Sequence, residues 1–291
     1  MTTHTEAEIA SQPACWRRAV EEVPADALPR PGERVAVVGC GTSWFIAQAY
    51  AVLRERAGHG ETDAFAASEA PTGRSYDRVL ALTRSGTTTE VLELLKGTGT
   101  RTTAITADPD TPVMTLADEV IVLDFADERS VVQTRFATTQ LALLRAHLGE
   151  DLTGAIADAE RALAVPLAPE PVSAEQFTFL GRGWSYGLAL EAGLKMREAC
   201  RAWTEAYPAM EYRHGPISIA GPGRVTWMLG ESPAGLRGEV EATGGTFLES
   251  GLDPMAELVT IQRVAVARAL RQGLNPDEPL HLTRSVILPA R

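Results

Sequence analysis

The feature that most constrains the fold is a repeated order of apolar strand, glycine-containing loop and helix. Residues 34–38 (RVAVV) form an apolar, β-branched run, which is followed by the loop 39–43 (GCGTS) and a helical pattern at 44–56. The same order recurs where residues 177–180 lead through the loop 181–183 (GRG) into a second helical pattern. Strands that alternate with helices predict a parallel sheet covered by helices. The recurrence predicts an α/β protein made of two similar lobes.

Further patterns of both kinds fill the two halves of the chain. We expect additional strands at residues 78–82, 102–106, 119–125, 225–229 and 246–248, and helices at residues 5–22 (interrupted at 12–13), 89–96, 136–148, 151–164, 233–242 and 254–272. The proline-rich segment 166–171 (PLAPEP) predicts the boundary between the lobes. The resulting division is an N-terminal helix and connector at 1–30, a first lobe at 31–165 and a second lobe at 172–291.

The most unusual segment is a helical pattern at residues 188–206 that is apolar almost all round and should therefore be buried. It carries charged residues on one stripe, at spacings of four, three and seven: Glu191, Lys195, Glu198 and Glu205. Unpaired buried charge costs several kcal/mol, so the stripe needs an explanation. From spacing alone, two explanations remain open. One is a structural ion-pair network centred on Lys195, and the other is a catalytic acid–base set completed by His214 from the following turn.

Two loops in the first half offer the donors that an anion needs. The segment 41–43 (GTS) opens one helix, and 83–90 (TRSGTTTE) opens the next, with Thr87 and Glu90 spaced as a capping box. Backbone N–H groups at a helix N-terminus, together with clustered hydroxyls and an arginine, favour an anion site over ordinary capping. The equivalent place in the second half, 230–233 (GESP), holds an acid and a proline, so we expect only one such site.

Composition and motif spacing exclude several classes of protein. The net charge is −11 and no basic run is present, which argues against nucleic acid or an anionic membrane surface as a partner. No apolar run approaches membrane-spanning length, and the N-terminus lacks the pattern of a secretory signal. Cys15, Cys40 and Cys200 have no metal-like spacing and predict free thiols in a reducing cytoplasm. A dinucleotide site is excluded because its third glycine would fall on Trp44.

Taken together, these motifs resemble the sugar isomerase (SIS) family. The similarity lies in GCGTS, in TRSGTTTE, in QTRFATTQL at residues 133–141 and in LEAGLKMREACRAWTEAYPAMEYRHGP at residues 190–216, and it extends over essentially the whole chain. In pattern the chain is similar to the isomerase half of glucosamine-6-phosphate synthase and to stand-alone amino-sugar-phosphate deaminase and fructosamine deglycase-like enzymes. The resemblance implies two flavodoxin-like lobes, each a parallel sheet between two layers of helices, usually in a homodimer.

The resemblance also implies roles for individual residues. The family's phosphate-binding positions fall on Ser43, Thr83, Arg84, Ser85 and Thr88, with Thr42, Gln133 and Arg284 as further candidate substrate contacts. Its acid–base glutamate falls on Glu198, its helix lysine on Lys195 and its neighbouring glutamate on Glu191. The ring-opening histidine falls on His214, which in relatives reaches the site from the partner subunit. No metal and no cofactor are expected.

The implied reaction starts from an amino-sugar 6-phosphate such as glucosamine 6-phosphate. Glu198 would take the proton from C2 after His214 has helped to open the ring, and the resulting ketose imine would be hydrolysed to ketose phosphate and ammonia. No glutaminase segment precedes the first lobe, so glutamine-dependent amination is not expected. Arg284 stands where the synthase has a tail lysine, and a guanidinium cannot form a Schiff base.

Two alternatives remain open. With an N-acetylated amino-sugar 6-phosphate, the same deprotonation at C2 could expel the C3 hydroxyl, which would make the protein a dehydratase. A non-catalytic sugar-phosphate sensor would keep the phosphate loops but would have no use for a glutamate and a histidine together. The joint presence of Glu198 and His214 therefore favours an enzyme.

Overall fold

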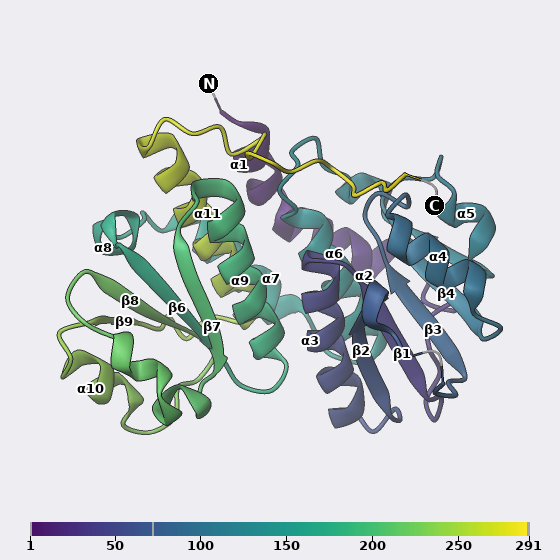
Figure 1. The fold of residues 1–291 in the computed structure, drawn as a ribbon, viewed down its shortest axis with the longest axis horizontal. Helices are drawn as coiled ribbons and strands as arrows, with labels where there is room; N and C mark the ends of the chain where they lie inside the picture. The colour runs from purple at the N-terminus through teal and green to yellow at the C-terminus, as the bar shows by residue number, and fades with distance from the viewer. Residues whose placement is uncertain (1, 72, 290–291) are drawn as a thin grey trace. The chain divides into compact units, whose positions relative to one another are not determined.

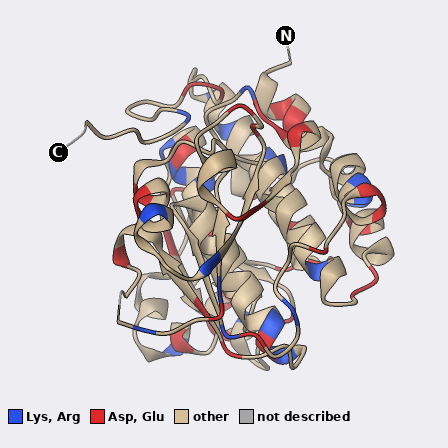
Figure 2. Ribbon diagram, turned by 90° about the vertical axis from the view of Figure 1, so that its right-hand side faces the viewer, with Lys and Arg blue, Asp and Glu red and all other residues tan. Residues whose placement is uncertain are grey.

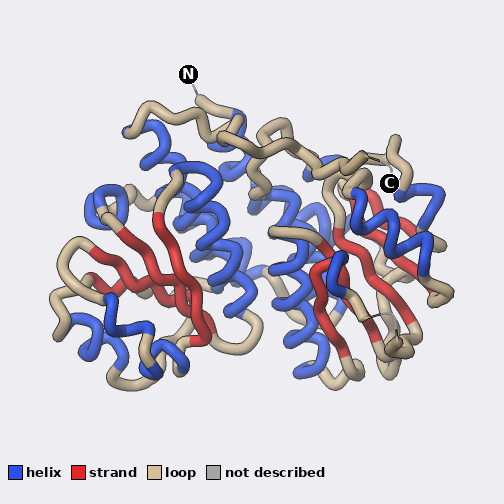
Figure 3. Tube along the Cα trace, viewed as in Figure 1, coloured by secondary structure: helices blue, strands red, loops and turns tan. Residues whose placement is uncertain are grey.

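The computed structural model describes residues 2–71 and 73–289. By its internal contacts the chain divides into two compact units, each built on one sheet. The first lobe comprises residues 14–152 and the C-terminal segment from residue 282. The second lobe comprises the N-terminal residues up to 13 and residues 153–281. Figure 3 shows each group of strands with helices on both of its faces, which confirms the predicted α/β class.

The first lobe contains a five-stranded, wholly parallel sheet in the order β2-β1-β3-β4-β5. Its strands are β1 (Val35–Gly39), β2 (Thr62–Ala66), β3 (Arg78–Leu82), β4 (Arg101–Thr106) and β5 (Glu119–Val122). Its helical elements are α2 (Gln12–Glu22), α3 (Thr42–Arg56), η1 (Ala67–Glu69), α4 (Thr89–Gly97), α5 (Val113–Leu116), η2 (Asp124–Ala126) and α6 (Arg135–His147). The helices α4 and α5 pack on one face of the sheet, and α3 and α6 lie on the other (Figure 1).

The second lobe contains a four-stranded parallel sheet in the order β7-β6-β8-β9. Its strands are β6 (Gln176–Gly181), β7 (Trp203–Pro208), β8 (Arg224–Leu229) and β9 (Thr246–Leu248). Its helical elements are α1 (His4–Ala10), α7 (Thr153–Ala164), α8 (Pro169–Ser173), α9 (Ser185–Cys200), η3 (Glu211–His214), η4 (Pro216–Ile219), α10 (Leu236–Glu241) and α11 (Pro254–Arg271). The helix α9 packs against the sheet and against α11, which makes it a buried helix, as its apolar pattern predicts.

The two lobes repeat one local design at the end of their first strand. Gly39 and Gly181 each end that strand, and a Cβ added to either would lie within 2.7 Å of the backbone of the following helix. Gly41 and Gly183 adopt φ angles of 53° and 55°, in the left-handed region that glycine enters without strain. The glycine pairs singled out in the sequence therefore have the same structural role, and the prediction of a duplicated lobe is confirmed.

The predicted helix at residues 188–206 is too long. The helix α9 ends at Cys200, where Arg201 turns into the left-handed conformation with φ 54°, and the chain then forms β7. Glu205 consequently lies on a strand and does not belong to the charged stripe. The segment WTEAYP pairs in parallel with β6, and this pairing overrides the local helical pattern. The stop was not visible in the sequence because arginine, rather than glycine, occupies the left-handed position.

Other boundaries also differ from the expected ones. The strand β2 and the helix α5 were not predicted, and β5 ends at Val122, before a short η2 turn. The predicted boundary at 166–171 contains the start of α8, whereas the units divide after residue 152, because α7 packs against α11 of the second lobe. The C-terminal segment from residue 282 belongs to the first lobe and not to the second. Among the remaining predicted elements, β3 and β9 have the predicted bounds, and the others are present with shifted ends.

Charged residues are mixed rather than segregated by sign. In Figure 2 the Lys and Arg positions lie among the Asp and Glu positions along helices and loops alike. Exposed pairs such as Arg18–Glu22, at 2.8 Å, contribute little to stability. Among the described residues, no helix combines the length and the apolar character needed to span a bilayer.

The close approach at Gly181 predicts a specific effect on stability. A Cβ at this position would lie 2.4 Å from backbone atoms of Ser185, so Gly181→Ala is expected to lower the free energy of unfolding by about 2 kcal/mol or more. Gly238→Ala is the matched control, since nothing lies within 4 Å of its added Cβ, and alanine favours helix α10 by about 0.5–1 kcal/mol. Urea-induced unfolding measures both changes. Equal effects of the two substitutions would show that the close approach is not maintained.

Candidate functional site

The two predicted anion-binding loops lie at the same edge of the first-lobe sheet. The strands β1 and β3 are parallel neighbours, so their carboxyl ends and the loops that follow them meet. The connections from these two strands lead into α3 and α4, which cover opposite faces of the sheet. In open α/β sheets this switch point, outside the carboxyl ends of the strands, is where ligands bind. The fold therefore brings the residues around Ser43 and the 83–88 loop together at the position favoured for a ligand.

The hydroxyl groups in these loops are not used to cap the helices. Thr42 and Ser43 form the first turn of α3 and are buried. The N-cap residue of α4 is Thr88, and its side chain makes no capping hydrogen bond, so the expected capping box is not formed. Thr83 is buried, and its Oγ1 has no hydrogen-bond partner among the described residues. Ser85 Oγ accepts a hydrogen bond from the amide of Thr87 at 3.3 Å. The hydroxyls of Thr83 and Thr88 therefore do not serve to cap the helix.

A residue from the other end of the chain enters this loop. Ser285 Oγ lies 3.1 Å from Ser85 Oγ, 2.9 Å from Thr87 Oγ1 and 3.4 Å from Thr88 Oγ1. All four hydroxyls belong to the first lobe, because the C-terminal segment packs with it. We call the set Ser85, Thr87, Thr88 and Ser285 the hydroxyl cluster. Ser285 was not among the predicted site residues, because nothing in its local sequence pattern distinguishes it from an ordinary serine.

Arg84 lies in the same loop, but its side chain is already engaged by an acid. Arg84 Nη1 is 3.1 Å from Glu128 Oε2, and the two side chains are 1% and 0% exposed. The guanidinium also donates to two backbone carbonyl oxygens, at 3.3 and 3.0 Å. Glu128 Oε1 accepts from the amides of Thr134 and Arg135 at 2.5 and 2.8 Å, at the start of α6. The positive charge of Arg84, which was predicted to attract the phosphate, is thus balanced by the negative charge of Glu128. Glu128 was not among the predicted site residues.

Arg284 and Gln133 lie near this ion pair in the first lobe. Arg284 Nη2 is 2.5 Å from Asp127 Oδ1, Nη1 donates to the carbonyl of Glu128, and the Arg284 carbonyl accepts from Arg84 at 3.2 Å. Gln133 is half-buried, and its Oε1 has no hydrogen-bond partner among the described residues. Arg284 therefore anchors the C-terminal segment to the 127–128 turn, and Gln133 retains an unused acceptor.

Cysteine chemistry does not contribute to the loops. Cys15 and Cys200 are buried and Cys40 is half-buried, and all are free thiols, as the sequence predicts. Burial raises the pKa of the Cys40 thiol to about 11, and the charge of Glu90 acts in the same direction. The Cys40 side chain is therefore a protonated thiol near neutral pH and a poor nucleophile.

The charged stripe of α9 forms a compact cluster within the second lobe. Lys195 Nζ is 3.4 Å from Glu191 Oε1, and it donates to Glu198 Oε2 from the other side. Lys195 and Glu191 are buried, whereas the Glu198 side chain is 18% exposed. The predicted ion-pair network exists, with Lys195 at its centre. Of its three members only Glu198 is partly exposed, so Glu198 is the one that a ligand can reach.

His214 lies in a separate part of the second lobe. It ends the short η3 turn that follows β7, and its side chain is exposed. Gly215 follows with φ 130°, a backbone conformation that suits glycine. A role for His214 in the site of a partner subunit stays a prediction.

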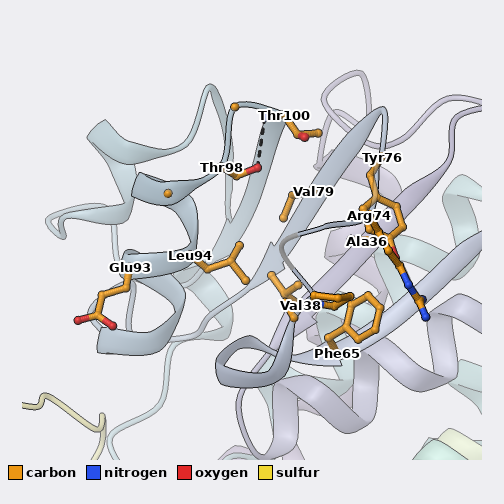
Figure 4. Close-up of a pocket in the computed structure, with 14 residues that line it drawn as sticks. Ala36, Val38, Phe65, Arg74, Tyr76, Val79, Glu93, Leu94, Thr98 and Thr100 are labelled. Carbon is orange, nitrogen blue, oxygen red and sulfur yellow. Dashed lines mark hydrogen bonds between the residues drawn. The ribbon is translucent and has the colours of Figure 1, made fainter.

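Two of the cavities in the described part of the chain have features of interest, and both lie away from the loops. The first, of about 320 Å³, lies on the α4 side of the first-lobe sheet, and Figure 4 shows it between the β-strand residues Val38 and Val79, the helix residue Leu94 and the ring of Phe65. The connection from β2 to β3 contains only the short η1 turn instead of a full helix, and this leaves part of the sheet face uncovered. Its lining residues, among those that the structure describes, include none of the residues predicted to bind phosphate or to transfer a proton.

The second cavity, of about 380 Å³, lies in the second lobe and contains a perturbed carboxyl group. Burial raises the pKa of Glu257 to about 7, against the opposing effect of the Trp227 indole, which donates to Glu257 Oε1 at 2.5 Å. The nearby charge of Glu249 raises this pKa further. Ser250 Oγ donates to the other oxygen of Glu257. The hydrogen bonds hold the carboxyl group in place, and its burial makes it a titrating group near neutral pH.

Glu257 predicts a pH dependence of stability. Its carboxyl group binds a proton more tightly in the folded chain than in the unfolded chain, where the pKa is 4.5. The stability it contributes is therefore complete below the unfolded pKa and is lost as the pH rises through about 7. Between about pH 5 and pH 8 the loss amounts to about 2 kcal/mol. Glu257→Gln should remove this component, so urea unfolding of the variant should vary less over the same range; parallel pH profiles would contradict the assignment.

The buried Arg84–Glu128 pair predicts a large effect from a small change. Glu128→Gln leaves a buried guanidinium without its counter-charge and is expected to lower the free energy of unfolding by about 3 kcal/mol. Glu22→Gln is the control, because Glu22 pairs with Arg18 at the surface, and its change should stay within about 0.5 kcal/mol. Chemical denaturation measures both. A loss at Glu128 no larger than at Glu22 would mean that water reaches the Arg84 guanidinium.

Comparison with known proteins agrees with this geometry. Residues 30–148 match the model of the SIS domain. The chain is 29% identical to glutamine–fructose-6-phosphate aminotransferase [isomerizing] of Gloeobacter violaceus, over 87% of this chain and 52% of that relative. It is 27% identical to the enzyme of the same name from Sulfurisphaera tokodaii, over 87% of this chain and 50% of that relative. The chain therefore spans about half the length of these curated relatives.

Solved structures resemble the chain over nearly its full length. A glucosamine-6-phosphate deaminase from Thermotoga maritima has a TM-score of 0.83 and 26% identity, and covers 98% of this chain and 100% of its own. The C-terminal domain of glucosamine-fructose-6-phosphate aminotransferase from Francisella tularensis has a TM-score of 0.82 and 21% identity, and covers 96% of this chain and 98% of its own. At this level of identity the similarity shows only that the two chains share a fold. The chain is a protein of two flavodoxin-like α/β lobes with a hydroxyl-rich loop at the switch point of the first. Its first lobe is similar to the SIS domain over residues 30–148.

Proposed function

We propose that this protein is a phosphosugar-processing enzyme that acts on an amino-sugar 6-phosphate of the glucosamine 6-phosphate type. Glucosamine 6-phosphate and water would give fructose 6-phosphate and ammonia. The observation that carries the proposal is the pairing of two features on one chain. One is a hydroxyl-rich loop at the ligand-binding edge of the first lobe, and the other is a carboxylate presented by a buried, ion-paired helix of the second lobe. The resemblance to a glucosamine-6-phosphate deaminase structure over the whole chain supports the choice of reaction.

The phosphate would be bound by neutral donors rather than by a cluster of cations. The net charge is −11, and the loop arginine is balanced by Glu128, so long-range attraction contributes little. The hydroxyls of Ser43, Ser85 and Thr88 and the amides that open α3 and α4 are the groups proposed to hold it. Amides at a helix N-terminus bind anions through their N–H groups and the helix dipole. Such a site accepts a phosphate without attracting nucleic acid.

Glu198 is the proposed base for the proton at C2. In the ring-opened amino sugar, it removes this proton and returns it to C1, and the enolamine becomes the imine of the ketose. Water adds to the imine carbon and ammonia leaves, which completes the hydrolysis. Lys195 Nζ donates a hydrogen bond to Glu198 Oε2, which fixes the orientation of the carboxylate. Glu191, on the far side of Lys195, balances the buried ammonium when the substrate shields Glu198.

His214 is the proposed group for ring opening, acting in the site of a second copy of the chain. Its exposed position in a surface turn is compatible with that role, and a neutral imidazole carries one donor and one acceptor nitrogen. Arg284 does not supply an amine for a Schiff base, and its guanidinium is paired with Asp127. The proposed reaction needs no such amine, because the leaving group is the amine of the substrate itself.

The test is turnover against binding in a matched pair of variants. Glu198→Gln is expected to reduce ammonia release from glucosamine 6-phosphate by about 10²–10⁴-fold, the usual contribution of a positioned base, while the Kd for the sugar phosphate changes little. Ser85→Ala should show the opposite pattern, with weaker binding and a smaller change in kcat. Glu241→Gln, an exposed glutamate in α10, is the control and should leave both quantities unchanged.

Several outcomes would redirect the assignment. Retained turnover in Glu198→Gln removes this residue from the role of base. Turnover of N-acetylglucosamine 6-phosphate with loss of water, but none of the free amine, would make the protein a dehydratase that uses the same deprotonation. Binding with neither ammonia release nor exchange of the C2 proton by NMR would make it a sensor.

A further inference from the structure

The hydroxyl cluster of the first lobe is occupied by the protein's own C-terminal segment. Ser285 Oγ lies within 3.4 Å of the hydroxyls of Ser85, Thr87 and Thr88. The segment continues along the start of α4, where the Val286 carbonyl accepts from the amide of Thr89 at 3.2 Å. In Figure 1 the yellow C-terminal segment runs past the helix α4. Residues 285–288, here called the C-terminal strap, therefore use the same donors that a bound anion would use.

An anion and the strap cannot use these donors at the same time. A phosphate oxygen that accepts hydrogen bonds from Ser85, Thr87 and Thr88 must lie about 2.7–3.0 Å from each hydroxyl oxygen. Ser285 Oγ occupies a position 2.9–3.4 Å from the same three atoms, so the two oxygens would overlap. The Thr89 amide, at the N-terminus of α4, is likewise bonded to Val286 and is free for an anion only when the strap has moved.

The strap is held by a few polar contacts rather than by buried apolar surface. Val286, Ile287 and Leu288 are 52%, 70% and 49% exposed, so their side chains add little to its attachment. Its contacts are the hydroxyls around Ser285, the bond to Thr89 and the amide of Leu288, which donates to Thr89 Oγ1 at 2.9 Å. Each such hydrogen bond contributes about 1 kcal/mol net, so opening the strap has a low cost.

The anchor of the strap lies just before it. Arg284 pairs with Asp127 at 2.5 Å, and its carbonyl accepts from the buried guanidinium of Arg84 at 3.2 Å. Arg84 is itself fixed by Glu128. Because these contacts do not involve the hydroxyl cluster, they can persist when residues 285–288 detach. The strap then pivots at Arg284 and remains close to the loop.

From this geometry we infer that the C-terminal strap is an autoinhibitory element that competes with phosphate for the hydroxyl cluster, with Ser285 as the competing group. Binding of a phosphate group releases residues 285–288 from α4, and loss of the phosphate lets them return. The inference rests on the proposed phosphate site and adds to it a residue that sets the apparent affinity of that site. When the strap occupies the site, the apparent Kd equals the intrinsic Kd divided by the fraction of molecules in which the strap is open.

The test measures the affinity of the full chain for inorganic phosphate by isothermal titration calorimetry. Ser285→Ala removes the competing oxygen and is expected to lower the Kd by about five-fold, the equivalent of one net hydrogen bond. Leu288→Pro removes the donor to Thr89 Oγ1 without altering the cluster and should also lower the Kd. Ile287→Ser is the control, because this side chain is 70% exposed, and its Kd should match that of the parent.

A second measurement reports on the strap itself. Hydrogen exchange in the peptide that contains residues 285–289 should become faster when phosphate is added to the parent chain. An unchanged or raised Kd in Ser285→Ala overturns the inference, since a raised value would make Ser285 a ligand of the phosphate. If Ser85→Ala abolishes phosphate binding while Ser285→Ala leaves it unaltered, the autoinhibitory role of the strap is wrong, but the proposed phosphate site is supported. If neither the parent chain nor Ser285→Ala binds phosphate, both the proposed phosphate site and the autoinhibitory role of the strap are wrong.

Discussion

The arrangement of the candidate site depends on the parallel pairing of β1 with β3. This pairing aligns Val35 with Arg78 and Val38 with Ala81, so both strands end at one edge of the sheet. The loops that follow these strands lead into the helices α3 and α4, which lie on opposite faces of the sheet. Everything proposed for the first lobe, from the amides at the helix ends to the hydroxyl cluster, follows from this alignment. Gly39 and Gly41 permit it, the first by lacking a Cβ where the next helix approaches and the second by its left-handed conformation.

The two lobes share this alignment but use it differently. In the second lobe the loop after β8 is filled by an internal carboxylate, because Glu249 accepts from the Ser232 amide at 2.6 Å and from its hydroxyl at 3.1 Å. A built-in anion at this position is incompatible with a bound phosphate. In the first lobe the equivalent loop is met by Ser285, a neutral group on an exposed segment. The loop after β8 is thus occupied by the carboxylate of Glu249, whereas the equivalent loop after β3 is contacted by the neutral hydroxyl of Ser285.

Buried charge is handled in the same way in both lobes. The buried Arg84 is paired with the buried Glu128, and the buried Lys195 is paired with the buried Glu191 and the partly exposed Glu198. Such pairs contribute little net stability, but losing one partner is costly, so they fix geometry. In the first lobe the pair orients the anion loop and the anchor of the C-terminal strap. In the second lobe it orients a single partly exposed carboxylate.

The sequence by itself determined the class of fold, the duplication and the residues of the charged helix. These features are encoded in local order, because strand, glycine loop and helix follow one another, and Glu191, Lys195 and Glu198 share a helical spacing. The tertiary structure decided the rest. It ended α9 at Cys200 through strand pairing that no local pattern announced. It also paired Arg84 with Glu128 and brought Ser285 to Ser85 across 200 residues of chain, contacts that depend on how distant segments pack.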